Sequence, residues 1–192
     1  MNFVKEKEIL HKSQLGFLSG NRTSDAHIIL NNLIRKNCHR NNSKIYSCFI
    51  DFSRAFDSIP RNILLKKLLS HNINGSVFNI IRTIYTRDKA GIKIGNKRTE
   101  YFEVQKGVRQ GCVLSPLLFN IFVSDIIKEM ELSTNTRFRI GNTEIFSLVW
   151  ADDMVIFANS EEGLRELLKF FEISCNKHEL MINTDKTKCM IF

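Results

Sequence analysis

The chain has 192 residues, enough for one domain that buries a sizeable core without disulfide or metal support. Hydrophobic residues make up 43% of it and charged residues 25%, with only 9 Gly and 2 Pro, which excludes disordered, collagen-like and low-complexity proteins. The longest apolar runs fall short of the roughly 18 residues that a membrane span needs, and the N-terminus lacks the apolar core of a signal peptide. We therefore expect an intracellular protein, nuclear or cytoplasmic, that is not secreted and has no membrane partner.

The positive charge is concentrated in the middle of the chain. The net charge is +8, and residues 61–110 hold 11 Lys and Arg against 3 acidic residues, whereas residues 111–192 hold 8 against 12. Such a block suits a surface that faces a polyanion, and it suits an ordinary solvated face equally well. The five cysteines are an odd number without zinc-site spacing, which favours buried thiols in a reducing compartment.

In chain order, hydrophobic spacing first predicts a helix over 25–37. A short apolar run rich in β-formers predicts a core strand over 44–52. Helices are predicted over 57–69, with an early proline, and over 77–85. Glycines between apolar positions then indicate a β-hairpin over 90–104.

The second half of the chain begins with a strongly apolar helix over 115–130, where Ser115 and Pro116 are typical of a helix start. Shorter elements follow: strands over 137–140, 145–149 and 154–158, a helix over 161–176, and strands over 180–182 and 189–192. Helices interleaved with mainly antiparallel strands predict an α+β fold in a single domain.

Three carboxylates carry the predicted chemistry. Asp51 lies near the end of one predicted core strand, and Asp152 and Asp153 lie at the tip of a separate hairpin. If those strands pair, the three like charges repel unless divalent cations bind between them, and Mg²⁺ prefers oxygen ligands of this kind. An Asp-Asp pair is also common in ordinary surface turns, but apolar strands on both sides make that interpretation weaker here.

Several segments, in order, closely resemble motifs of reverse transcriptases from non-LTR (LINE-type) retrotransposons. The segments are Gln14-Leu15-Gly16-Phe17, Gly20-Asn21-Arg22-Thr23, residues 49–57 (FIDFSRAFD), residues 107–116 (GVRQGCVLSP), Trp150-Ala151-Asp152-Asp153 and residues 182–188 (INTDKTK). They cover nearly the whole chain. The resemblance implies a right-hand polymerase palm with a ferredoxin-like antiparallel sheet packed on helices, over 45–192, and partial fingers over 1–44. Relative to the family pattern, we expect further fingers segments and a thumb to belong to a longer polyprotein.

The resemblance also implies roles for individual residues. The catalytic set is Asp51, Asp152, Asp153 and Lys186; the metal ligands are the three aspartates and the Phe52 carbonyl; the nucleotide set is Phe52, Ser53, Arg54, Ala55, Phe56 and Gln110; the template and primer set is Arg22, Gly107, Arg109 and Gly111. Phe56 matches the ring that excludes a ribose 2′-hydroxyl, although core packing explains it equally well. Lys186 matches a lysine that protonates departing pyrophosphate, although a lone lysine beside a strand is usually only solvated.

Two positions depart from the family pattern. Trp150 replaces a more usual Tyr, and Glu179 stands where a Gly is common, which costs of order 1 kcal/mol if the backbone there is left-handed.

The implied function is RNA-directed DNA polymerisation. Two Mg²⁺ ions, or Mn²⁺ in their place, would support transfer of a nucleotide from a dNTP to a DNA primer on an RNA template. The alternative is a catalytically dead nucleic-acid-binding remnant of a truncated retrotransposon, which predicts binding without extension. A metal nuclease is a weaker interpretation, because no His or Lys that could act as a general base is close to Asp51 or Asp152 in sequence.

Overall fold

The computed structural model describes residues 2–40, 42–134 and 136–192. Its centre is a four-stranded sheet in the order β10-β1-β9-β8, with every neighbouring pair antiparallel. The sheet strands are β1 (Tyr46–Ile50), β8 (Ser147–Trp150), β9 (Asp153–Ala158) and β10 (Lys188–Ile191). β1 and β9 lie in the middle and are largely buried, which explains why their sequences are nearly continuous apolar runs.

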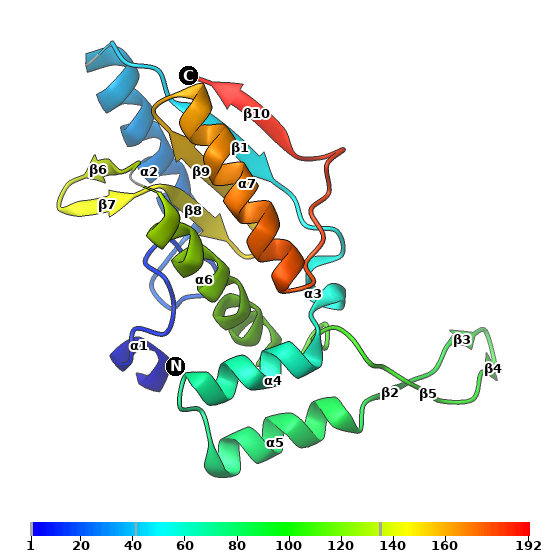
Figure 1. Ribbon diagram of the computed structural model, residues 1–192. Helices are drawn as coiled ribbons and strands as arrows, with labels where there is room; N and C mark the ends of the chain where they lie inside the picture. The colour runs from blue at the N-terminus through cyan, green and yellow to red at the C-terminus, as the bar shows by residue number, and fades with distance from the viewer. Residues whose placement is uncertain (1, 41, 135) are drawn as a thin grey trace.

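Helices cover both faces of this sheet (Figure 1). On one face lie α6 (Ser115–Ser133) and α7 (Glu161–Lys177), whose apolar side chains join those of the sheet in the larger core cluster. On the other face lies α2 (Thr23–Ile34), which packs over β8 and the small hairpin of β6 (Phe138–Ile140) and β7 (Thr143–Ile145). The sheet is therefore held between two apolar layers, so only its ends and its β10 edge face solvent.

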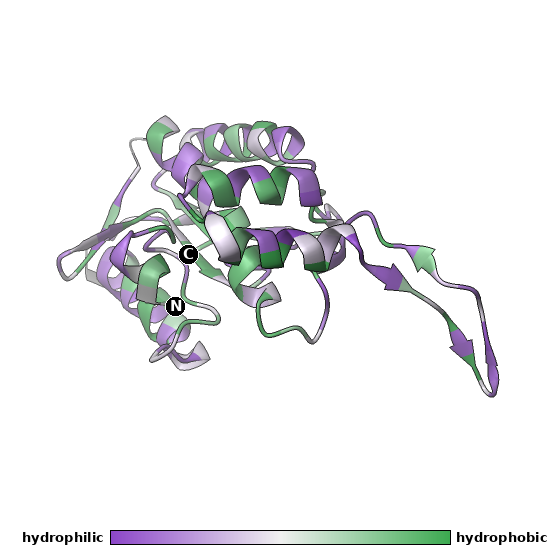
Figure 2. Ribbon diagram, turned by 90° about the horizontal axis from the view of Figure 1, so that it is seen from below, coloured by the Kyte–Doolittle hydropathy of each residue, from purple (hydrophilic) through white to green (hydrophobic). Residues whose placement is uncertain are grey.

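The π-helical turn η1 (Arg35–Arg40) directly continues α2. The remaining helices lie toward the opposite end of the molecule in Figure 1: α1 (Asn2–Glu6), α3 (Ala55–Ser58), α4 (Arg61–Ser70) and α5 (Gly75–Thr86). After α5 the chain forms a long hairpin from β2 (Lys89–Ala90), β3 (Lys93–Ile94), β4 (Lys97–Arg98) and β5 (Phe102–Glu103). Figure 2 shows this hairpin, which we call the arm (residues 89–103), extending away from the body of the protein.

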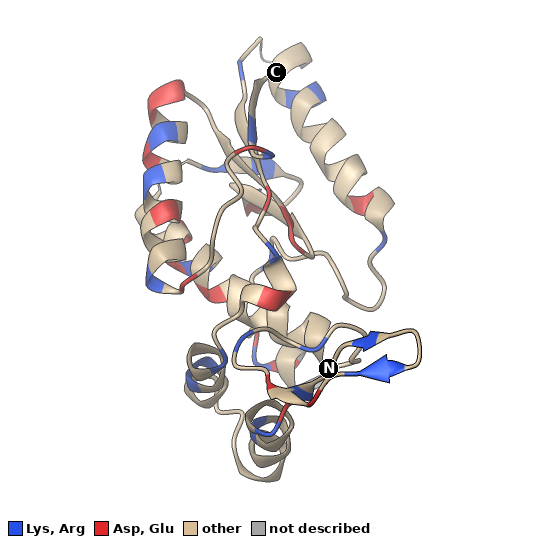
Figure 3. Cartoon of the chain, turned by 90° about the vertical axis from the view of Figure 1, so that its right-hand side faces the viewer, with Lys and Arg blue, Asp and Glu red and all other residues tan. Residues whose placement is uncertain are grey.

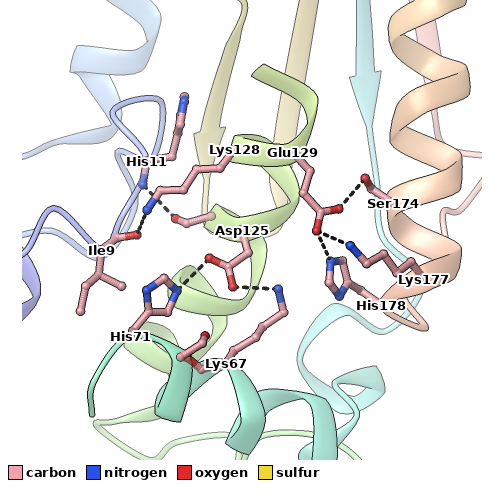
Figure 4. Close-up of polar contacts among 12 residues, drawn as sticks. Ile9, His11, Lys67, His71, Asp125, Lys128, Glu129, Ser174, Lys177 and His178 are labelled. Carbon is pink, nitrogen blue, oxygen red and sulfur yellow. Dashed lines mark hydrogen bonds and ion pairs between the residues drawn. The ribbon is translucent and has the colours of Figure 1, made fainter. Parts of the chain in front are cut away.

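Polar side chains of α6 tie the surrounding segments together (Figure 4). Asp125 accepts hydrogen bonds from Lys67 at 2.9 Å and contacts His71 at 2.8 Å, which links α6 to α4. Glu129 links α6 to the C-terminal part of α7 through Ser174, Lys177 and His178. The packing of the helices partly removes these charged groups from water, and the contacts give each of them a hydrogen-bonding partner.

The predicted α+β class and antiparallel pairing agree with the structure, but some boundaries were wrong. The strand expected over 180–182 is a single bridge between Phe52 and Ile182. The strand expected over 145–149 is divided at Phe146, and the helix expected over 25–37 leaves α geometry after Ile34. No helix in the described part of the chain combines the length and apolar character needed to cross a bilayer.

Candidate active site

The first acidic residue, Asp51, directly follows the central strand β1. The β1–β9 register pairs Ile50 with Met154, so the next step along both strands sets Asp51 opposite Asp153. The backbone of Asp51 is fixed on its other side: Asn183 N–H donates to its carbonyl at 2.8 Å, and its own N–H donates to Thr187 Oγ1 at 3.3 Å. Asp51 is thus positioned by a neighbouring strand and by the segment that precedes β10.

The other two acids form the tip of the β8–β9 hairpin. Trp150 pairs with Asp153, which leaves Ala151 and Asp152 as a two-residue turn, and Ala151 has a left-handed φ of 59°. Loss of solvent raises the pKa of the Asp153 carboxyl, and the negative charges of Asp152 and Asp51 raise that pKa further. The three carboxylates are therefore close enough to repel one another, as the sequence pattern predicts.

Lys186 extends toward the same carboxylates. Its Nζ lies 3.8 Å from Asp51 Oδ2, and its side chain is 69% exposed. The short turn that carries it is closed by Thr187 N–H donating to the Asn183 carbonyl at 2.9 Å. Because this turn also contacts Asp51, the ammonium group is held beside the acids while remaining open to solvent.

The donor chemistry of this edge suits a hard divalent cation. Carboxylate oxygens are the ligands Mg²⁺ prefers, and a cation relieves the repulsion that raises the Asp153 pKa. In the described residues, however, no three His, Cys, Asp or Glu side chains converge into a group that could hold a metal ion. The three acids are neighbours at one edge rather than a closed cage, which leaves coordination positions for water or substrate phosphate.

Gly16 packs directly against the backbone of the hairpin tip, a role that sequence reasoning missed. The segment of residues 13–16 runs along β8: Leu15 N–H donates to the Val149 carbonyl at 2.8 Å, and Val149 N–H donates to the Ser13 carbonyl at 2.9 Å. A Cβ on Gly16 would lie 2.4 Å from the backbone nitrogen of Ala151. Only glycine fits this close approach. The resemblance had marked the motif, but nothing local in it indicated the contact.

Phe56 lies at a cavity beside the tip. Its ring stacks on Phe119, with centroids 4.6 Å apart and planes 20° apart, and Phe17 packs edge-on at 6.3 Å. A cavity of about 410 Å³ borders Phe17 and Phe56 and continues along residues 109–113. Stacking on Phe119 supports the interpretation of Phe56 as a core residue, and its position on the cavity wall supports the nucleotide role, so the structure is compatible with both.

The glycines of residues 107–116 have different surroundings. Gly107 has a φ of 87°, and a Cβ there would lie 2.8 Å from the backbone of Asp57, so its close approach is to the protein itself. Gly111 has a φ of 81° and open space around it, on the wall of the cavity. Between them, Gln110 donates to Asp57 Oδ1 at 2.9 Å and remains exposed.

Residues 52–55 connect β1 to α3. Phe52 is buried with its ring 5.9 Å from that of Phe171, and Ser53 N–H donates to the Met181 carbonyl at 2.8 Å. The amide of Ser53 is therefore already used within the protein. Arg54 is exposed with a left-handed φ of 50°, and the buried Ala55 begins α3.

Arg109 is held by an ion-pair cluster at the base of the arm. Asp88 accepts from Arg109 Nε at 2.8 Å and from the buried Arg61 at 2.6 Å. Burial acts to raise the pKa of Asp88, but hydrogen bonds from Arg109 and Arg61 outweigh it and hold that pKa below its ordinary value. Arg61 and Lys67 are 7% exposed, so these two members of the basic block face the interior rather than a polyanion.

Arg22, the remaining residue of the predicted template and primer set, is exposed immediately before α2. Its backbone N–H donates to Asp25 Oδ2 at 2.7 Å, which caps the helix start.

Comparison with known proteins agrees with the motifs. The family model described as "Reverse transcriptase (RNA-dependent DNA polymerase)" matches residues 1–191. Among curated proteins, the chain is 28% identical over 179 residues to the Retrovirus-related Pol polyprotein from type-1 retrotransposable element R2 of Nasonia vitripennis, covering 93% of the chain and 17% of that protein. It is 27% identical over 152 residues to the RNA-directed DNA polymerase from mobile element jockey of Drosophila funebris, covering 76% and 16%. These relatives are several times longer than the matched region.

Solved structures share the fold. Apo telomerase from Candida tropicalis, truncated from the C-terminal domain, superposes with a TM-score of 0.76 at 14% identity, covering 100% of this chain and 38% of that one. Telomerase from Candida albicans in complex with a TWJ fragment of telomeric RNA superposes with a TM-score of 0.73 at 13% identity, covering 98% and 32%. With the polymerase fold and the family match in agreement, the chain belongs to the reverse transcriptase family, with relatives among non-LTR retrotransposon polymerases.

Proposed function

We propose that this chain is the catalytic core of an RNA-directed DNA polymerase, which adds deoxynucleotides to a DNA primer on an RNA template. In this proposal residues 45–192 form the palm, with a ferredoxin-like sheet, and residues 1–44 form part of the fingers. The observation that carries the proposal is the meeting of Asp51 with Asp152 and Asp153, which lie 101 and 102 residues further along the chain, at one end of one sheet.

Asp51, Asp152, Asp153 and the Phe52 carbonyl would hold two Mg²⁺ ions, with Mn²⁺ as a substitute. Divalent ions bound there lower the pKa of the attacking 3′-hydroxyl and stabilise the charge on the leaving pyrophosphate. The protein contributes the fixed geometry of the acids. Asp51 is anchored by backbone hydrogen bonds on both sides, and the hairpin tip rests on Gly16.

Lys186 supplies a proton donor at the same edge. Its Nζ remains exposed and lies 3.8 Å from Asp51, which keeps it within reach of a phosphate bound nearby. In this proposal Lys186 Nζ gives its proton to the departing pyrophosphate.

The cavity beside Phe56 would receive the sugar and base of the incoming dNTP. Phe56 cannot move easily because its ring is held between Phe119 and Phe17, so a ribose 2′-hydroxyl meets a fixed wall. Gln110 and Gly111 border the same cavity and offer an amide and an open backbone to the nucleotide. Arg54 and Ala55 would face the triphosphate, and Arg22, Gly107 and Arg109 would contact or position the template and primer.

Primer extension on an annealed RNA template tests this function. Asp51→Asn and Asp152→Asn should each abolish extension in Mg²⁺, because each removes a carboxylate from the metal site. Asp185→Asn is the matched control, since Asp185 is an exposed acid on the neighbouring turn without a proposed role. Undiminished extension by Asp51→Asn or Asp152→Asn would refute the assignment.

One observation favours a second candidate. In the described residues the three acids do not form a closed metal-holding group. A noncatalytic nucleic-acid-binding remnant fits this observation. It predicts salt-sensitive binding of an RNA–DNA hybrid, with no extension by the unaltered chain under any divalent cation.

A further inference from the structure

The arm has a chemical character unlike that of the body. It holds four Lys and Arg and two Glu, and the six residues at its tip, 93–98, hold three basic residues and no acid. Figure 3 shows the basic residues on both strands of the arm. No arm residue belongs to either described hydrophobic core cluster, so packing of the body does not explain why the arm carries these basic and aromatic side chains.

Two features of the arm cost stability when it stands alone. Lys93 lies directly opposite Arg98 in the antiparallel register, and like charges in such a pair repel. Across the described chain, no carboxylate lies within ion-pair distance of Lys93, Lys97 or Arg98. The arm also exposes large apolar side chains, with Tyr101 71% and Phe102 50% exposed. A bound polyanion with stacking surfaces would offset both costs.

The charged and aromatic groups meet at one hollow. It measures about 350 Å³ and is lined by Gly91, Ile92, Lys93, Arg98, Thr99 and Tyr101. The Tyr101 ring lies over Gly91, where an added Cβ would be 3.4 Å from the ring. An aromatic face beside two cations is the combination that binds a base together with its phosphate.

The base of the arm is fixed rather than loose. The buried guanidinium of Arg61 donates to the Val104 carbonyl, to the Tyr85 carbonyl at 2.8 Å and to Asp88 at 2.6 Å, which joins the two ends of the arm. Its Nε also donates to the Gly107 carbonyl at 2.8 Å, next to the wall of the Phe56 cavity. A rigid base allows the arm to hold a ligand at a defined place relative to the candidate active site.

We propose that the arm binds single-stranded nucleic acid, with Lys93, Arg98 and Lys97 on the phosphates and Tyr101 stacked on an unpaired base. Unpaired bases are required because the faces of paired bases are covered within a duplex. The proposal depends on the proposed function only for identifying this strand as the unpaired part of the template. The arm then contacts the template strand outside the nucleotide site, and this contact increases the affinity of the protein for the template.

Fluorescence anisotropy with a short labelled oligouridine, over a series of salt concentrations, tests the cationic part. Lys93→Gln with Arg98→Gln should lower the magnitude of the slope of log affinity against log salt by about 1.4, because two phosphate contacts on a single strand are lost. Arg165→Gln with Lys169→Gln on the exposed face of α7 is the matched control and should leave the slope near that of the unaltered chain. An unchanged slope in the arm variant, or an equal fall in the control, would overturn the proposal.

The aromatic part is tested with Tyr101. Tyr101→Ala should weaken oligouridine binding about tenfold without changing the salt slope, and Tyr101→Phe should restore it. Binding of a blunt RNA–DNA duplex should be the same for all three proteins, and an equal loss on the duplex would contradict the single-strand assignment. All of these variants should melt at the temperature of the unaltered chain, since the arm lies outside the core. Asp152→Asn, which abolishes extension, should keep full oligouridine affinity, so failure of the polymerase proposal is separable from failure of this one.

Discussion

Replacing Gly16 with alanine tests whether the hairpin tip must rest against the segment of residues 13–16. The new Cβ would lie 2.4 Å from the Ala151 nitrogen, 3.1 Å from the Trp150 carbonyl carbon and 3.2 Å from the Trp150 Cα. All three are backbone atoms, so no flexible side chain can turn away. Since Cβ contacts are normally at least about 3.4 Å, the tip must move by up to about 1 Å.

Two effects of Gly16→Ala can be given magnitudes. Overpacking of this kind costs about 1–3 kcal/mol of unfolding free energy, which lowers the melting temperature by about 2–12 °C for a chain of this size. A displacement of about 1 Å in a catalytic group can cost about 10²-fold in rate. Because Ala151 directly precedes Asp152, we expect extension to fall by this larger factor even at temperatures where the variant is fully folded.

The assay combines thermal unfolding with single-turnover primer extension well below the melting temperature. Gly163→Ala is the matched control, because a Cβ there meets the movable Ser160 hydroxyl at 3.2 Å in the first turn of α7. That control should keep its extension rate. A Gly16→Ala protein that melts and extends like the unaltered chain would show that the contact does not position the tip.

Three further predictions concern charge. Arg61→Met should lower the unfolding free energy by about 3–5 kcal/mol in denaturant titration, because it leaves a buried carboxylate and several carbonyls short of donors; Lys66→Met, exposed on the same helix, should stay within about 0.5 kcal/mol. Asp153→Asn should raise the melting temperature in EDTA at neutral pH. The pKa of Asp153 is raised in the folded state, so its negative charge destabilises that state above pH 3.8. A lower melting temperature for the variant would contradict this. Burial lowers the pKa of His11 and of His178 below 6.5. Below pH 6.5 the unfolded state therefore binds protons that the folded state does not, so the unfolding free energy should fall as the pH drops. Replacing either histidine by Gln should reduce that fall.

Local sequence signals were sufficient for most elements of the fold. Hydrophobic periodicity located α4, α6 and α7, and the Gly-Asn turn located the arm. The expected caps were wrong, because Asp57 and Ser58 belong to the separate helix α3 and Ser115 lies inside α6 rather than capping it. The backbone at Glu179, where glycine is common in the family pattern, is left-handed with a φ of 54°, so the strain cost considered for that case applies. The segment of residues 180–182 looked like a strand because it is apolar, yet it makes only one bridge, between Phe52 and Ile182, whose two hydrogen bonds run from Ser53 N–H to the Met181 carbonyl and from Asn183 N–H to the Asp51 carbonyl.

The parts that could not be predicted depend on distant partners. Arg61 counted as a surface charge in the sequence, but four hydrogen-bond partners from separate segments make it a buried anchor. Gly16 belongs to a motif whose residues do not indicate that its neighbour is Ala151, 135 positions away. The approach of Asp51 to Asp152 and Asp153 was predicted only by assuming that two strands pair, and the register of β1 and β9 supplies that pairing.

The central claim is that Asp51 and the Asp152-Asp153 pair bind the same divalent cations, and titration of the chain with Mn²⁺ followed by electron paramagnetic resonance tests it most directly. The account predicts that Asp51→Asn and Asp153→Asn each weaken Mn²⁺ binding by at least about tenfold, whereas Asp185→Asn binds like the unaltered chain. Binding by Asp51→Asn that matches the unaltered chain, in number of ions and in affinity, would contradict the claim.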